Sequence, residues 1–368
     1  MAKPIHCVAD ARRLAKRRMP RIIFDYVDGA AGVEYANSIN SQRLQQIRLQ
    51  PRVLVNVDQR QLSKTLLGKD WDLPFGIAPM GMCNLTWPDA DRMLAEAARH
   101  FNIPMAQSTM SSSTIEQIAS WAGAQGWFQL YVGQSEEQAF ELVDRADSAG
   151  FATLILTVDV PQVAPRVRDL RNGFKSPLKI GAKQFLDFAL HPEWSIRSLM
   201  AGVPSPANFA PGTFDREAKR GLADWGFLDR LRSRWQGNLI VKGVLSAEDA
   251  LRIQSAGADA IYVSNHGGRQ LDSAPAAIDI LPVIRQSVGP DFPLLFDSGV
   301  RDGEGIIKAL ACGADFVMLG RALLYGLGAD GEAGLNQVIN LIRNEVGLAM
   351  AQLGCRDIRN IDRNILIQ

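Results

Sequence analysis

One histidine and one arginine stand three residues apart in a glycine-rich stretch, where residues 264–272 read Ser-Asn-His-Gly-Gly-Arg-Gln-Leu-Asp. An apolar run that is typical of a buried strand, residues 260–263, comes directly before it. His266 can accept a proton near neutral pH, and Arg269 is a fixed cation with a planar fork of donors. Together they suit removal of a proton from an anionic small molecule. The alternative is a surface turn with an incidental histidine, but functional residues concentrate on loops that a rigid scaffold holds.

Eight short apolar runs recur along the chain, with helical patterns between them. The runs occupy residues 75–79, 104–108, 127–131, 153–159, 239–243, 260–265, 293–299 and 316–321, and the clearest helical patterns occupy 88–100, 113–122, 135–149, 246–256 and 303–311. This alternation predicts an α/β fold, a (β/α)8 TIM barrel over about residues 75–350. An open doubly wound sheet is the alternative, and the lack of a Gly-x-Gly-x-x-Gly motif after the first run weakens it.

Polar or glycine residues stand at the end of every predicted strand, where barrel enzymes carry their catalytic groups. These strand-end residues are Ala78, Pro79, Met80, Gly81, Ser108, Gln129, Tyr131, Thr157, Asp159, Lys242, Ser264, His266, Asp297, Gly299, Arg301, Gly320 and Arg321. The glycines and arginines after the last two strands predict a phosphate site, because backbone amides and guanidinium groups hold such an anion. Lys242 follows a buried run, and its alternative role is that of a buried ion-pair partner.

Composition narrows the class of protein further. The 40 Lys and Arg nearly balance the 39 Asp and Glu, and they are scattered, which argues against a nucleic-acid partner. The four cysteines are far apart in the sequence, so we expect neither a disulfide framework nor a metal site, and a reducing cytoplasm fits. No signal-peptide core is present, and no apolar run approaches the ~20 residues of a membrane-spanning helix. We expect one domain, residues 1–368.

Two segments lie outside the strand-and-helix alternation. The residues before the first strand are expected to form a helical extension that closes the bottom or the side of the barrel. Residues 172–221, after the fourth strand, are rich in Gly, Pro and Ser and are expected to form a long loop over the catalytic face. Within it, the apolar and basic residues of 179–200 suit contact with a membrane surface. A lid packed on its own barrel or on a neighbouring subunit is the alternative.

Taken in order, these segments resemble the FMN-dependent α-hydroxy acid oxidase/dehydrogenase family, and the resemblance covers nearly the whole chain. It rests on residues 24–26, 77–79, 127–131, 156–159, 241–243, 264–272, 297–301 and 319–321. Gly81 and residues 166–172 and 319–327 are most similar to the mandelate and lactate dehydrogenase branch. The resemblance implies an FMN cofactor, a small (S)-2-hydroxy acid substrate, a quinone or oxygen as electron acceptor and a homotetramer.

The resemblance also implies roles for the catalytic residues. His266 would be the general base, and Asp159 would stabilise the imidazolium that forms. Lys242 would lie near the flavin and stabilise its anionic reduced ring. Gly81, next to the flavin, favours a dehydrogenase over an oxygen-using oxidase. Besides a location in the cytoplasm, the resemblance leaves open a peripheral location on the inner face of the membrane.

Further residues would bind substrate and cofactor. Arg269 and Arg166 would clamp the substrate carboxylate, while Tyr26 and Tyr131 would hydrogen-bond the carboxylate and the hydroxyl. Without the resemblance, Tyr26 reads as a core tyrosine and Arg166 as a surface cation. The cofactor contacts would come from Ala78, Pro79, Met80, Ser108, Gln129, Thr157, Lys242, Ser264, Asp297, Gly299, Arg301, Gly320 and Arg321.

Two other kinds of function stay open at this point: an FMN-barrel isomerase or another phosphate-binding barrel, and a barrel that only binds. The trio His266, Arg269 and Lys242 favours oxidation of a 2-hydroxy acid, because each residue has a dedicated use in that reaction. The sequence leaves open which 2-hydroxy acid is oxidised and which acceptor takes the electrons.

Overall fold

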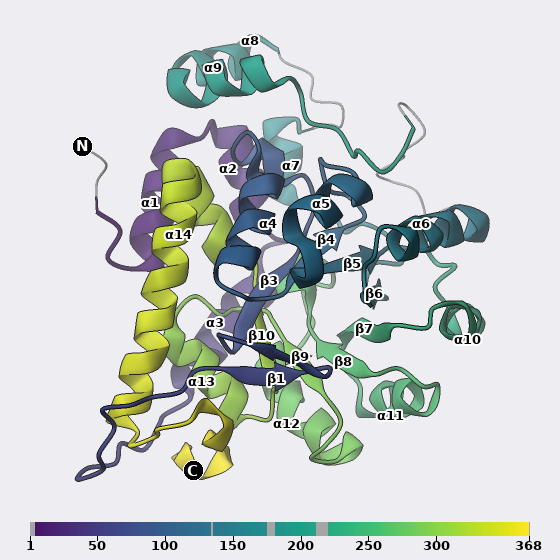
Figure 1. Cartoon of the computed structure of the whole chain (residues 1–368). Coiled ribbons are helices and arrows are strands. Elements are labelled where there is room, and N and C mark those ends of the chain that lie inside the picture. The colour runs from purple at the N-terminus through teal and green to yellow at the C-terminus, as the bar shows by residue number, and fades with distance from the viewer. Residues whose placement is uncertain (1–3, 134, 175–180, 211–219, 368) are drawn as a thin grey trace.

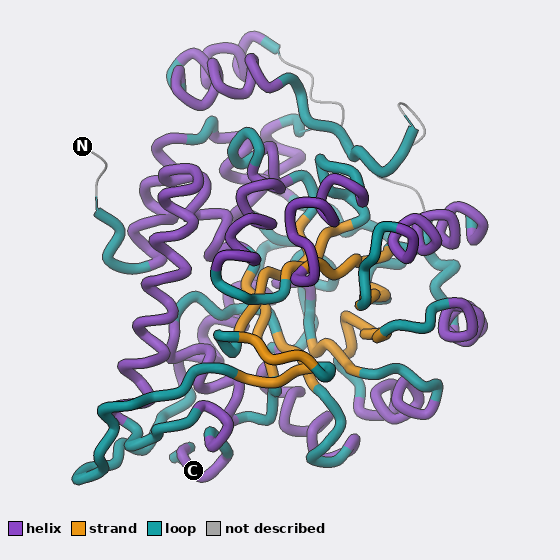
Figure 2. Tube along the Cα trace, viewed as in Figure 1, coloured by secondary structure: helices purple, strands orange, loops and turns teal. Residues whose placement is uncertain are grey.

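Eight parallel strands close a barrel at the centre of the molecule, and helices surround it (Figure 2). The computed structural model describes residues 4–133, 135–174, 181–210 and 220–367. The barrel strands, in the spatial order β10-β3-β4-β5-β6-β7-β8-β9, are β3 Phe75–Met80, β4 Met105–Ser108, β5 Gly126–Leu130, β6 Thr153–Thr157, β7 Asn238–Val244, β8 Ala260–Val263, β9 Leu294–Phe296 and β10 Phe316–Leu319. Each of the eight predicted runs is one of these strands, and the predicted (β/α)8 fold is confirmed.

Helices cover the outside of the barrel (Figure 1). They are α4 Ala90–His100, α5 Ile115–Ala122, α6 Glu136–Ser148, α10 Trp225–Arg234, α11 Ala247–Ser255, α12 Ala277–Val288, α13 Gly303–Ala311 and α14 Arg321–Gln352, with short 3-10 turns η1 Cys83–Leu85, η2 Gly123–Gln125, η3 His266–Gly268, η4 Ile358–Asn360 and η5 Arg363–Ile365. Side-chain caps explain several helix starts. Ser135 accepts from the Gln138 amide and Ser246 from the Asp249 amide, which satisfies backbone donors that have no partner within the helix.

The inside of the barrel is apolar through most of its depth and becomes polar at the carboxyl ends of the strands. Large buried side chains fill it, among them Ile155, Ile240, Leu295 and Phe316. Because side chains alternate along a strand, the next inward position on β6 and β7 falls on Thr157 and Lys242, which pair in register. The barrel is therefore a packed core with a polar end, and the polar end holds the site.

The N-terminal extension is only partly as predicted. It contains α1 Val8–Arg18, α2 Arg21–Asp28 and α3 Tyr35–Gln46, but it ends in an antiparallel hairpin, β1 Lys64–Leu66 and β2 Lys69–Trp71. Leu67 and Gly68 have φ of +51° and +74°, the left-handed backbone that tight hairpin turns use. Trp71 packs edge-on against Trp127 at the start of β5, with ring centres 6.0 Å apart. The hairpin, not a helix, thus closes the bottom of the barrel.

The segment predicted as an uninterrupted loop, 172–221, contains two helices. Its described part holds α8 Ala182–Ala189 and α9 Pro192–Ala201, which follow the short helix α7 Val167–Asn172, while 175–180 and 211–219 lie outside the described residues. Pro192 occupies the first turn of α9, where its missing N–H has no helical partner to lose. In Figure 1 the pair α8 and α9 stands apart from the barrel sheet. The loop prediction is therefore wrong for these residues.

One side of this helix pair is docked and the other is exposed. Trp194 is 5% exposed, and its Nε1 donates to the Thr86 carbonyl at 3.1 Å. The outward side carries large apolar side chains that are 59–84% exposed: Phe185, Leu186, Leu190, Ile196, Leu199 and Met200. No described helix has both the length and the apolar character needed to cross a membrane.

Candidate active site

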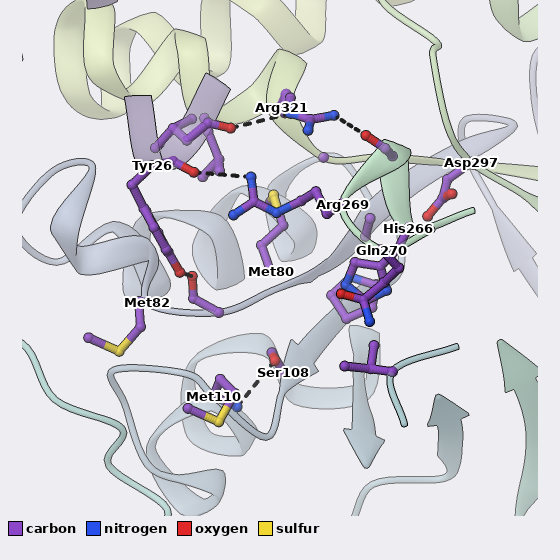
Figure 3. A pocket seen from close by; sticks show the side chains of 18 of the residues that line it. Tyr26, Met80, Met82, Ser108, Met110, His266, Arg269, Gln270, Asp297 and Arg321 are labelled. Carbon is purple, nitrogen blue, oxygen red and sulfur yellow. Dashed lines mark hydrogen bonds between the residues drawn. The ribbon is translucent and has the colours of Figure 1, made fainter. Parts of the chain in front are cut away.

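Most of the predicted site residues line one cavity of about 230 Å³ at the carboxyl ends of the strands (Figure 3). They are Tyr26, Ala78, Pro79, Met80, Ser108, Tyr131, Arg166, Lys242, His266, Arg269, Asp297, Gly299, Arg301, Gly320 and Arg321. Gln129, Thr157, Asp159 and Ser264 do not line the cavity; they form a second layer in contact with residues that do.

His266 lies in a strained turn just after β8. Its φ is +59°, and Gly267 and Gly268 follow at +63° and +74°. A left-handed backbone is uncommon for a residue with a side chain, and such strain concentrates at functional sites. Two hydroxyls hold the turn: Ser264 Oγ accepts the His266 N–H at 2.9 Å, and Ser298 Oγ accepts the Gly267 N–H at 3.1 Å. The imidazole is therefore presented to the cavity by a fixed backbone.

The imidazole of His266 lies between a carboxylate and a phenol. Its Nδ1 is 2.9 Å from Asp159 Oδ1, and its Nε2 is 3.3 Å from the Tyr131 hydroxyl. Burial lowers the pKa of His266, and the charge of Asp159 offsets only part of this effect. The ring is therefore neutral near pH 7. In the tautomer that carries its proton on Nδ1, this N–H donates a hydrogen bond to Asp159. The other ring nitrogen, Nε2, is then unprotonated and can accept a proton.

The two neighbours of the imidazole hold opposite protonation states. Burial, and after it the charge of Asp159, raises the pKa of the Tyr131 phenol, so the phenol remains a donor. Burial opposes ionisation of Asp159, but its interaction with His266 and the charge of Lys242 outweigh burial, and the pKa of Asp159 is lowered. An ionised carboxylate on Nδ1 stabilises the imidazolium that would form once Nε2 takes a proton.

Arg269 and Arg166 reach the same cavity from different segments. Arg269 Nη1 donates to the Tyr26 carbonyl at 3.0 Å (Figure 3), and to the Gly29 carbonyl at 2.7 Å. Arg166 immediately precedes α7 and forms an isolated parallel bridge with Gly32. The N-terminal extension thus positions both arginines.

Tyr26 is part of the cavity wall and not only of the core. Its hydroxyl lies 3.4 Å from the Gly81 carbonyl, and its ring stacks on Phe174 with centroids 4.7 Å apart. The Arg269 guanidinium lies 5.5 Å from the centre of the Tyr26 ring. A cation and a phenol therefore meet at one corner of the cavity, which suits recognition of a carboxylate.

Lys242 is 3% exposed and belongs to a short polar network. Its Nζ donates to Ser264 Oγ at 3.0 Å and lies 3.8 Å from an Asp297 oxygen. Ser264 Oγ in turn donates to Asp297 at 2.6 Å. Ser264, predicted as a cofactor contact, connects Lys242, Asp297 and the His266 turn within the protein.

Two further arginines, Arg301 and Arg321, line the same cavity together with Gly299 and Gly320. Burial lowers the pKa of Arg321 to about 10, and the charge of Arg301 adds to this effect. Arg321 donates to the carbonyls of Val27, Gly29 and Gly267. Two cations that repel each other beside glycine backbone fit an anion such as a phosphate between them. The described residues hold no group of three or more His, Cys, Asp and Glu that could bind a metal ion.

Two buried polar atoms fit a flavin at the centre of the site. The Nε2 of Gln129 and the Oγ1 of Thr157 have no hydrogen-bond partner among the described residues, although both side chains are buried. Such atoms cost roughly 1–3 kcal/mol each unless a ligand supplies the partner. An isoalloxazine carries carbonyl and ring-nitrogen groups that can do so. Gly81 allows two backbone segments of the cavity wall to approach closely. A Cβ at this position would lie 2.8 Å from the Met110 Cβ.

Sequence reasoning missed several residues of the cavity wall. Met82, Leu85, Phe174 and Pro204 line it and make one side apolar. Arg220 also lines it, with its guanidinium 5.1 Å from the centre of the Tyr131 ring. Nothing in the local sequence distinguishes Arg220 from the other charged residues of its loop.

Comparison with known proteins identifies the class to which this fold and site belong. The FMN-dependent dehydrogenase family matches residues 15–368. (S)-Mandelate dehydrogenase of Pseudomonas putida is 41% identical, over 100% of this chain and 95% of that protein, and L-lactate dehydrogenase of Pseudomonas syringae is 36% identical, over 99% of each. The crystal structure of the monotopic membrane protein (S)-mandelate dehydrogenase is 40% identical with a TM-score of 0.95, over 99% of this chain and 100% of that one. The chain belongs to the FMN-dependent dehydrogenase family, and FMN is its cofactor.

The His266 turn requires glycine at position 268 for steric reasons as well as for its φ. A Cβ on Gly268 would lie 2.4 Å from the Asn37 nitrogen in α3. Gly68 has the same φ of +74° but nothing within 4 Å of such a Cβ. We therefore expect Gly68→Ala to cost only the ~1–2 kcal/mol of the left-handed backbone, and Gly268→Ala to cost more and to lower the FMN content. Thermal unfolding and the flavin absorbance of the purified variants check this. Equal losses in the two variants would contradict the steric argument.

Proposed function

We propose that this protein oxidises an (S)-2-hydroxy acid to the 2-oxo acid, with His266 as the base, and that the electrons pass to a quinone or a similar acceptor. The observation that carries the proposal is a neutral imidazole, backed by Asp159, in a cavity that Arg269 and Arg166 also line. Bound FMN takes up the two electrons of such an oxidation and passes them on. The names of the relatives, which are mandelate and lactate dehydrogenases, support the same reaction.

His266 acts through its Nε2. The oxidation removes one hydrogen from the substrate hydroxyl and one from C2, together with two electrons. Nε2 accepts one of these hydrogens as a proton, and the other would pass to bound FMN together with the two electrons. The charge that forms on the imidazole is stabilised by the Asp159 carboxylate on Nδ1. Tyr131, held as a neutral phenol, donates to the substrate hydroxyl oxygen. Because the base is already neutral at pH 7, no other group has to remove its proton first.

Arg269 and Arg166 hold the substrate carboxylate, and Tyr26 adds a hydroxyl donor from α2. Orientation of the carboxylate fixes where the substrate's C2 lies relative to His266. The apolar wall of Met82, Met110 and other side chains favours a 2-hydroxy acid with an apolar side chain, of the mandelate or lactate type.

Other residues of the site would hold the cofactor. Ser108 and the backbone of residues 78–80 line the cavity and would contact its ring, and Lys242 would place a positive charge beside it. Gln129 and Thr157, in the layer behind the lining, would offer the ring their unpartnered polar atoms. Arg301, Arg321 and the backbone of Gly299 and Gly320 would hold its phosphate, and Asp297, which also lines the cavity, would contact the ribityl part.

The base is tested by His266→Ala and by the pH dependence of catalysis. We expect the variant to retain FMN but to be reduced anaerobically by the hydroxy acid at least ~10²-fold more slowly. In the wild type, kcat/KM should fall as the pH drops through the lowered pKa of His266, so its acid limb should lie below 6.5. Asp159→Asn should move this limb to still lower pH, because the Asp159 charge raises the pKa of His266. Near wild-type reduction of the His266 variant would place the base elsewhere.

The carboxylate clamp is tested by Arg269→Lys, which keeps the charge but loses the planar fork. We expect a higher KM and a lower kcat, and a strong preference of the wild type for a hydroxy acid over its methyl ester. The same kcat/KM for acid and ester would argue against a carboxylate clamp.

We further propose that the exposed face of α8 and α9 rests on a membrane, where a quinone acceptor is found. Trp194 and the ion pair of Arg18 with Glu193, at 2.9 Å, dock the other face on the protein. The exposed apolar side chains then form one patch, as expected of a segment that lies in the membrane interface. The related structure described as a monotopic membrane protein supports this proposal.

Sedimentation with vesicles of phosphatidylethanolamine and phosphatidylglycerol tests the membrane contact. We expect the wild type to sediment with the vesicles. We expect the combined variant Phe185→Ser, Leu186→Ser, Leu199→Ser and Met200→Ser to have an affinity for the vesicles that is at least roughly tenfold lower. Leu251→Ser, Val283→Ser and Leu348→Ser, at exposed positions elsewhere, form the matched control. Equal sedimentation of all three proteins would refute the contact, and loss of a dimer on gel filtration would assign the patch to a second copy of the chain.

A further inference from the structure

Lys242 has a third neighbour that the reaction as described does not use. The Nζ lies 5.1 Å from the centre of the Tyr262 ring, within the range of a cation–π interaction. The contact follows from the fold, because Lys242 on β7 and Tyr262 on β8 are partners in the barrel register. Both side chains point into the barrel, and they are 3% and 0% exposed. The ammonium therefore has an aromatic face beside it in a dry environment.

Tyr262 is an unexpected residue for this position. Its inward-facing neighbours in the barrel include Ile155, Ile240 and Leu295, which are aliphatic. Its hydroxyl forms no hydrogen bond of good geometry among the described residues, although Asp297 is close enough to act on it both as a charge and as an acceptor, and a buried hydroxyl without a well-placed partner costs roughly 1–3 kcal/mol. Burial, and after it the charge of Asp297, raises the pKa of the phenol well above its usual value, so the ring is neutral. Apolar filling alone would be served better by leucine or phenylalanine.

The two partners of Lys242 act on its charge in different ways. The Asp297 carboxylate, 3.8 Å away, attracts the ammonium and also cancels its field. The neutral ring attracts the ammonium through its quadrupole without adding a negative charge. Asp297 Oδ1 is moreover shared with the hydroxyls of Ser264 and Ser298, each at 2.6 Å. The ring therefore offers the ammonium an attraction that competes with a closer ion pair to the other oxygen, Asp297 Oδ2.

We propose that Tyr262 is a positioning residue for Lys242, and that its ring face holds the ammonium in the cavity with its charge uncancelled. This inference rests on the proposed function, in which Lys242 stabilises the negative charge of the reduced cofactor. Loss of the ring lets Lys242 move toward Asp297, and the bound FMN becomes harder to reduce. The hydroxyl is not required for this role, so phenylalanine is expected to replace tyrosine.

The test is the midpoint potential of bound FMN, measured by anaerobic titration against a reference dye. The variants either alter the ring at position 262 or remove it. Tyr262→Phe keeps the ring face, and 3,4,5-trifluorophenylalanine at the same position keeps the shape but weakens cation binding. Tyr262→Leu removes the ring. We expect Phe to match the wild type, and the other two to lower the reduction equilibrium constant by roughly threefold to tenfold, about 15–30 mV for a two-electron couple. If Tyr262→Leu impairs folding, the trifluorinated variant alone tests the role of the ring, because it keeps the shape of the side chain.

Lys242→Met separates this inference from the proposed function. A lower potential in Lys242→Met, together with wild-type potentials in the trifluorinated and leucine variants, would overturn the role of Tyr262 and leave that of Lys242 intact. A wild-type potential in Lys242→Met would overturn both. If Phe lowers the potential as much as leucine does, the hydroxyl and not the ring acts on the site, and the inference is wrong.

Discussion

Two guanidinium groups, one half-buried and one buried, bind the carboxyl end of α2, and the geometry of the site depends on them. Arg269 donates to the carbonyls of Tyr26 and Gly29, and Arg321 donates to those of Val27, Gly29 and Gly267. The last carbonyls of a helix have no partner within it and carry partial negative charge. Because the arginines come from the His266 turn and from the start of α14, this one interaction joins the N-terminal extension to the catalytic end of the barrel.

A buried carboxylate at the same helix end extends this connection. Asp28 accepts from Arg12 at 2.6 Å, Arg168 at 2.7 Å and Tyr325 at 2.7 Å. Burial opposes its ionisation, but the hydrogen bonds of Arg12 and the others outweigh it, and the pKa of Asp28 is lowered. The carboxylate is therefore paired from α1, α7 and α14 at once. These bonds fix the position of α7 relative to α2. Arg166 immediately precedes α7 and Tyr26 lies on α2, so the two cavity-lining side chains are fixed relative to each other.

The barrel and the polar ends of its strands could be predicted because both depend on local pattern. Strands buried on both faces are short apolar runs, and parallel strands bring their carboxyl ends together, so Thr157 and Lys242 could be placed side by side. The β1–β2 hairpin could not, because its strands are short and mostly polar, and its position depends on Trp71 packing against a distant strand. Asp272 shows the same limit: it belongs to the recognised motif, but its partners are the amides of Val33 and Ala36.

The division between an apolar interior and a polar end also connects folding with cofactor binding. Gln129 and Thr157 each bury a polar atom that has no partner among the described residues, and Lys242 buries a charge beside them. In an otherwise apolar core such groups lower the free energy of unfolding, unless a ligand supplies their partners. A cofactor that does so stabilises the folded chain by its binding free energy. With the contacts proposed above, FMN would therefore serve as the polar cap of the barrel core as well as its reactive group, and residues suited to the chemistry could be kept at this end although they would weaken an ordinary core.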